Sequence, residues 1–137
     1  MTFTHCPPVE FADLVSETFP DGKRYYTTPD GVRLPSVTTV IGAKKKESIQ
    51  RWRQRVGEEE ANKVSRKASS RGTQVHSLCE QYLNNESPDF SKVTADETKL
   101  MFKSIKPLMD RISNVWYQEQ ALWSKQLGMA GRCDVIA

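Results

Sequence analysis

His76 stands in the part of the chain whose residue types and spacing could carry out chemistry. In a helical frame of 3.6 residues per turn, Gly72, His76 and Glu80 lie on one face. A glycine one turn before the histidine removes a side chain from that face and lets a backbone or a phosphate come close. This face could therefore receive a partner backbone or a ligand phosphate. The spacing also fits the more frequent case of a polar histidine at the edge of a packed helix.

Asp134 is the second residue whose position is chemically informative. The alternation of apolar and polar residues predicts a strand over residues 130–137, with Arg132, Asp134 and Ile136 on one face. A carboxylate inside an apolar strand is expensive to bury unless it is paired or coordinates a metal. Asp134 is therefore a candidate for an ion pair or a metal ligand.

Basic residues are concentrated in the segment that precedes His76. The 137 residues carry 20 Lys and Arg, 17 Asp and Glu and a net charge of +3. Half of the basic residues lie between Lys44 and Arg71, against four acidic ones: Lys44, Lys45, Lys46, Arg51, Arg53, Arg55, Lys63, Arg66, Lys67 and Arg71. Such a patch indicates a polyanionic partner such as nucleic acid, although a solvated helix face that binds nothing is about as frequent.

The elements that would position these residues follow from pattern and turn residues. Pro29-Asp30-Gly31 predicts a β-hairpin of residues 23–28 and 32–34, and residues 34–42 favour extended chain until a basic helix starts near Lys46 or Ser48, with Trp52 as its apolar anchor. Residues 84–89 read as a loop. A capping box from Thr94 to Glu97 then opens a helix, and a strand spans residues 117–123 before a turn at 127–129. The core stripe of that helix is predicted as Met101, Ile105, Leu108, Ile112 and Val115.

These segments together resemble one family. The chain contains L-P-S-V-T-T-V-I, a basic helix with a tryptophan, R-G-T-x-V-H-x-x-x-E-x-Y-L and E-x-x-L-x-S-x-x-L-G-x-A-G-R-x-D-x-I, in this order. From Tyr25 to Ala137 it resembles the N-terminal and central part of RecB-type exonucleases of the PD-(D/E)XK superfamily, particularly those of phages and of mitochondrial genome maintenance. The resemblance implies an α+β fold with helices packed on a small mixed or antiparallel sheet, as an incomplete restriction-endonuclease-like core. The corresponding domain would span residues 23–137, after an N-terminal arm of residues 1–22.

The resemblance also implies site residues. His76 and Asp134 match the catalytic metal ligands of the family, and the metal would be Mg²⁺ or Mn²⁺, with no iron–sulfur cluster. Glu80 and Glu119 are candidates for a supporting role behind the ligands, with Glu80 orienting a metal-bound water. A salt bridge for Glu80 and a surface position for Glu119 are the alternatives. The residues expected to contact nucleic acid are Ser36, Thr38, Thr39, Arg51, Arg53, Arg55, Arg71, Gly72, Thr73 and Arg132. The hydroxyl groups among them serve equally often as turn and capping groups.

One part of the family pattern is missing. The family continues with a D-x-K or E-x-K strand, whereas the sequence ends in Val135-Ile136-Ala137. We therefore expect an incomplete metal site that holds its ion weakly. The expected function is metal-dependent exonuclease action on DNA, with a non-catalytic nucleic-acid-binding module and a helical partner-binding protein as alternatives. Strand polarity, single or double strands, DNA or RNA, and oligomeric state are left open.

The sequence also bears on where in the cell the protein is located. The sequence contains no signal peptide and no apolar run of the roughly 18 residues that a membrane span needs, so we expect an intracellular protein without membrane contact, in the host cytoplasm if it is phage-encoded. Cys6, Cys79 and Cys133 are too scattered for a disulfide framework or a zinc knuckle, and we expect reduced thiols, two of them buried.

Overall fold

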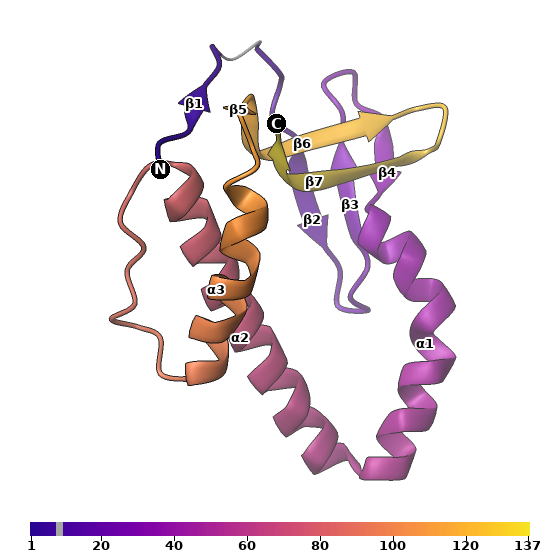
Figure 1. Ribbon diagram of the computed structural model, residues 1–137. Coiled ribbons are helices and arrows are strands. Elements are labelled where there is room, and N and C mark those ends of the chain that lie inside the picture. Colours follow the sequence, from indigo (N-terminus) through magenta and orange to yellow (C-terminus); the bar gives the residue numbers. More distant parts are fainter. Residues whose placement is uncertain (8–9) are drawn as a thin grey trace. The chain divides into compact units, whose positions relative to one another are not determined.

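A computed structural model describes residues 1–7 and 10–137 and contains both helices and strands (Figure 1). The predicted α+β class is confirmed, whereas a PD-(D/E)XK core stays a prediction. The chain forms two compact units. We call residues 1–7, 53–116 and 137 the helical unit and residues 8–52 and 117–136 the strand unit.

The strand unit begins with a three-stranded antiparallel sheet. Its strands are β2 (Val15–Thr18), β3 (Arg24–Thr27) and β4 (Arg33–Pro35), in the order β2-β3-β4 (Figure 1). The β3–β4 hairpin confirms the prediction from the Pro29-Asp30-Gly31 turn, and Gly31 supplies the positive φ of 82° that this turn needs. Strand β2 was not predicted, because residues 1–22 were expected to form an arm.

A second hairpin completes the strand unit. Strands β6 (Tyr117–Ser124) and β7 (Met129–Ile136) pair antiparallel through a four-residue turn, and they confirm the two strands predicted from the alternating pattern. The core of this unit consists of aliphatic and aromatic side chains from both hairpins and the residue before β2: Leu14, Tyr26, Leu34, Ala121 and Ala130. Trp123 packs against this core.

Helix α1 (Val37–Val56) carries six of the ten basic residues between Lys44 and Arg71 and starts about ten residues earlier than predicted. Ser36 explains the early start, because its Oγ accepts a hydrogen bond from the backbone N–H of Thr39 at 3.0 Å and so satisfies a free donor of the first turn. This cap outweighs the weak helix propensity of the β-branched residues that follow. No residue of α1 is buried, and Trp52, expected as its apolar anchor, is only half-buried.

The helical unit is built on α2 (Glu58–Leu83) and α3 (Asp96–Met109), which lie side by side in Figure 1. Gly57, with φ 89° and ψ 150°, separates α2 from α1. From the sequence, the basic helix and the His76 helix could be one bent helix or two. The break lies at Gly57, inside the basic segment, and α2 runs unbroken through Ala68-Ser69-Ser70 into the His76 segment. Helix α2 ends at Leu83, where the predicted loop begins.

Two predictions about α3 are wrong. The N-cap is Ala95, which makes no side-chain cap, so Thr94 and Glu97 form no capping box. The buried face consists of Thr98, Phe102 and Met109, while Met101 and Leu108 of the predicted stripe are exposed. The stripe failed because Phe102 stacks edge-on against rings outside α3, at centroid distances of 6.0 Å from Tyr82 and 5.6 Å from Phe90. These aromatic contacts rotate the helix toward Phe102.

The N-terminal residues are tied to the end of α2. Strand β1 (Thr4–His5) pairs parallel with β5 (Asn114–Val115). The Phe3 backbone exchanges two hydrogen bonds with the Asn85 side chain, of 2.6 and 3.0 Å, and the Phe3 ring stands edge-on to Tyr82 at 5.2 Å. Residues 1–7 therefore form part of the helical unit's packing.

Two smaller points concern the whole described chain. Among the described residues, no helix combines the length and the apolar character of a membrane span. Among the described residues, Cys6, Cys79 and Cys133 form no disulfide and all three are half-buried, so the prediction that two are buried is wrong.

Candidate metal centre

Glu119 and Asp134 form a pair of carboxylates on the β6–β7 hairpin. The register pairs Gln118 with Val135 and Gln120 with Cys133, so Glu119 and Asp134 stand opposite each other between these pairs. Their carboxylate oxygens lie within 4.8 Å of each other. Two carboxylates at this distance repel each other, and a cation between them would offset the repulsion. Asp134 is exposed and Glu119 half-buried, so an ion could reach the pair from solvent.

The backbone of Glu119 is held in an uncommon conformation. Its φ is +53°, in the left-handed region that residues other than glycine rarely adopt, and the strand ladder skips this residue without a change in register. The guanidinium of Arg132 donates a hydrogen bond to the Glu119 carbonyl and pairs with Asp13 at 3.0 Å. Such a conformation costs on the order of 1–3 kcal/mol and is typical of functional positions.

Glu119 and Asp134 are the candidate metal ligands that one unit of the described structure brings together. His76, the other ligand expected from the sequence, belongs to α2 in the helical unit. Carboxylate oxygens with one imidazole are a donor set suited to Mn²⁺ and acceptable to Mg²⁺. The two carboxylates therefore fit the divalent metal expected from the sequence, and Glu119 becomes a candidate for binding the ion directly.

The neighbours of His76 on α2 agree with the predicted helical face. Gly72 and Glu80 lie one turn before and after His76 within one helix, and Glu80 is half-buried. An added Cβ at Gly72 would meet no atom of the described chain within 4 Å, so the surface there is open. Thr73, expected to contact nucleic acid, donates its hydroxyl to the carbonyl of Ser69 at 3.1 Å.

The hydroxyl groups near the start of α1 form one hydrogen-bonded chain. Ser36 donates to Thr39 Oγ1 at 2.8 Å, and Thr39 donates to the Arg24 carbonyl at 3.3 Å. Because Ser36 has only one hydroxyl proton, Thr38 is the donor in its 2.9 Å contact with Ser36. Ser36 is buried, and Thr38 is exposed. Capping is therefore the observed role of Ser36 and Thr39, while Thr38 remains accessible to a ligand.

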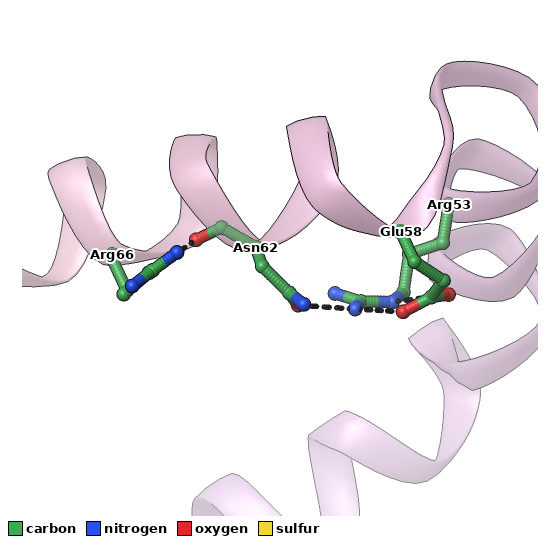
Figure 2. A network of polar contacts seen from close by, with 4 residues as sticks. All are labelled: Arg53, Glu58, Asn62 and Arg66. Carbon is green, nitrogen blue, oxygen red and sulfur yellow. Dashed lines mark hydrogen bonds and ion pairs between the residues drawn. The ribbon is translucent and has the colours of Figure 1, made fainter.

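Within the basic segment, two of the predicted DNA-binding arginines, Arg53 and Arg71, are held by acidic partners. Arg53 binds Glu58 and the side chain of Asn62, and the Asn62 carbonyl accepts from Arg66 (Figure 2). The hydrogen bonds from Arg53 lower the pKa of the Glu58 carboxyl. Arg71 pairs with Glu97 on α3 at 3.2 Å. These contacts compete with phosphate for both arginines.

Arg51 and Arg55 differ from these two. Both are exposed on α1, and the described part of the chain shows no ion pair for either. They are the arginines of the basic segment best placed to reach a phosphate from solvent. Arg132, in contrast, already contacts the Asp13 carboxylate and the Glu119 carbonyl.

Comparison with known proteins adds no relative: no protein-family model matches the sequence, and no curated protein or solved structure is detectably similar to the chain.

Proposed function

We propose that the protein binds DNA and a divalent metal ion as a metal-dependent exonuclease, with His76, Glu119 and Asp134 as the metal ligands. The observation that carries this proposal is the carboxylate pair, whose oxygens lie within 4.8 Å on facing positions of one hairpin. The resemblance of the sequence to RecB-type exonucleases supplies the reaction class, hydrolysis of phosphodiester bonds.

Each side chain has a separate task in this proposal. Glu119 and Asp134 hold the cation, and His76 adds a nitrogen ligand from α2. Arg132 keeps the Glu119 backbone in its strained conformation through the carbonyl contact. Arg51 and Arg55 attract the DNA backbone, because exposed guanidinium groups exchange readily with the counterions of phosphate. When bound, Mg²⁺ or Mn²⁺ would supply Lewis acidity toward the phosphate and ease the deprotonation of water.

The direct test is metal-dependent DNA binding by the 137-residue chain. The affinity for a short oligonucleotide is measured with and without Mn²⁺. We expect Mn²⁺ to raise the affinity, and Glu119→Gln or Asp134→Asn to remove that increase. Glu17→Gln is the matched control, since Glu17 is an exposed acidic residue on β2 of the same unit. An increase that survives in both variants would refute the proposed ligands.

Hydrolysis has a further requirement. The resembled family uses a lysine of a D-x-K strand, and residues 135–137 contain none. We therefore expect cleavage only in a chain that carries such a strand. Robust Mn²⁺-dependent cleavage by these 137 residues would show that another group supplies the missing charge.

A second candidate function is DNA binding without metal chemistry. The exposed Arg51 and Arg55 favour it, because they serve both functions equally. In that case the affinity for DNA would be independent of Mn²⁺ and would fall only when these arginines are replaced.

A further inference from the structure

The strand unit contains a pocket of about 470 Å³ that the sequence did not reveal. Strand β3, the start of α1 and the β6–β7 hairpin contribute its walls. The volume lies within the range of roughly 300–1,000 Å³ typical of small-molecule sites. Most of the exposed lining is apolar, and Leu122, Trp123, Leu127 and Met129 provide much of it.

A close contact between β7 and α1 shapes this pocket. Ser36, just before α1, forms a parallel bridge with Ala130 of β7. A Cβ on the next residue, Gly131, would stand 3.3 Å from Cγ2 of Val37, so the approach of α1 to β7 depends on a glycine. The wall formed by α1 is thus fixed to the hairpin by backbone contacts.

The lining combines a planar aromatic group with accessible polar groups. Trp123 is half-buried and packs against the core of the strand unit. Leu122 and Leu127 remain 38% and 68% exposed. Thr38, whose side chain is exposed, adds a hydroxyl group, and Arg24 adds a cation at the edge. This combination suits a flat, apolar ring with hydrogen-bonding groups on its edge.

The lining of the pocket runs along β7 toward the carboxylate pair, although neither carboxylate lines it. Arg132 and Cys133 line the pocket and directly precede Asp134, at roughly 3.3 Å per residue along the strand. Arg132 also contacts the Glu119 carbonyl. A ligand could therefore place a ring in the pocket and a phosphate beside Glu119 and Asp134.

We propose that this pocket holds a nucleobase of the DNA strand whose phosphate lies at the Glu119–Asp134 pair. The proposal rests on the proposed function, because the phosphate position depends on the metal ligands. Every nucleobase has an aromatic face that can stack, so the pocket accepts bases without reading sequence strongly. A base that is paired inside a duplex is not available, so the base must come from an unpaired end or a displaced nucleotide.

The test compares a short oligothymidylate with an abasic deoxyribose-phosphate strand of equal length. Both carry the same phosphates, so the ratio of their affinities isolates the contribution of the bases. We expect the wild-type protein to bind the oligothymidylate about tenfold more tightly, as one base stack contributes. Leu127→Ala should reduce this ratio about threefold. The matched control is Leu100→Ala, since Leu100 is 63% exposed on α3 and lies outside the pocket.

Two results would overturn the proposed base pocket. The first is that the wild-type protein binds the oligothymidylate and the abasic strand equally well. The second is that Leu127→Ala and Leu100→Ala change the ratio of these two affinities equally. The Mn²⁺-dependent affinity for the abasic strand, measured in the same titrations, reports on the carboxylate pair alone. If the wild-type affinity for the abasic strand does not depend on Mn²⁺ while the ratio of the two affinities stays near ten, the proposed metal ligands are refuted and the base pocket is not.

Discussion

Helices α1 and α2 share the basic segment of the chain but are stabilised in different ways. Helix α1 has 20 residues and none is buried, while α2 has 26 residues and buries Ala61, Val75, Leu78 and Leu83. Packing against other elements normally supplies most of a helix's stability in a protein. We infer that α2, with α3, forms the rigid support of the helical unit, and that α1 depends on its Ser36 cap and presents its side chains to solvent.

Disrupting the packing between α2 and α3 should give the largest loss of stability. Phe102→Ala removes a ring that is 5% exposed and contacts Tyr82 and Phe90. We expect a loss of about 3–5 kcal/mol in unfolding free energy, measured by urea denaturation. Ile49→Ala on α1 is the comparison, since Ile49 is 49% exposed. Its cost should stay within about 0.5 kcal/mol, and equal losses at both positions would contradict the distinction between the helices.

The boundary between the helices should show the next largest effect. Gly57→Ala forces a Cβ onto φ 89° and ψ 150°, and we expect a loss of about 1–3 kcal/mol. Gly72→Ala is a matched control inside α2, since an added Cβ has open space at both glycines. Only the backbone angle differs, so Gly72→Ala should stabilise by about 1 kcal/mol. Thermal unfolding of both variants would settle the contrast, and a destabilising Gly72→Ala would contradict it.

A polar contact between the end of α2 and the end of α3 gives a pH-dependent effect. The Tyr82 hydroxyl donates to Asp110 at 2.6 Å, and this bond, followed by that from Lys106, lowers the pKa of the Asp110 carboxyl below its usual 3.8. A carboxyl group whose pKa is lower in the folded than in the unfolded protein stabilises the fold at pH values above its unfolded pKa. This stabilisation is lost as the pH falls through the folded pKa. Tyr82→Phe should therefore destabilise at pH 7, less than Phe102→Ala does.

The same variant has a clear signature in acid. Its difference from the wild type should shrink as pH falls below 3.8, where protonation of Asp110 removes the acceptor charge. Unfolding curves recorded from pH 7 down to acid would show this convergence. A difference that is constant with pH would mean that the contact of the hydroxyl with Asp110 adds nothing to stability.

The smallest effects concern DNA binding by α1. Arg51→Ala and Arg55→Ala should each flatten the dependence of log affinity on log salt by about 0.7–0.9, the share of one phosphate contact. Arg53→Ala should change the slope less, because Glu58 already holds this guanidinium. Filter binding or anisotropy at several salt concentrations measures these slopes. A larger change for Arg53 than for Arg51 would show that the Glu58 pair opens on binding.

Much of the fold could be predicted from local signals. The Pro29-Asp30-Gly31 turn and the period-2 alternation after residue 116 predicted both hairpins, because such signals depend on neighbours in sequence. The buried face of α3 could not be predicted, since Phe90 and Tyr82 lie outside that helix. The start of α1 was missed because one hydroxyl, that of Ser36, outweighed the propensity of the residues after it.

The candidate site could also be predicted only in part, because one of its residues depends on the exact position of a turn. Asp134 was found because a charge in an apolar strand is unusual, but Glu119 was judged only a second-shell or surface residue. A hairpin turn centred on Gly128 would place Leu122 opposite Asp134. The observed turn, closed by the pair Ser124 and Met129, places Glu119 there instead. A shift of less than two residues in a turn thus decides whether the two carboxylates meet.

Direct measurement of Mn²⁺ binding tests the central claim, that Glu119 and Asp134 hold a divalent metal. The dissociation constant of Mn²⁺ for the 137-residue chain is measured by titration calorimetry or by paramagnetic resonance, without DNA. The account predicts saturable binding of one ion, weakened about tenfold or more by Asp134→Asn and by Glu119→Gln, and unchanged by Glu17→Gln. Equal affinity in the wild type and in both site variants would contradict it.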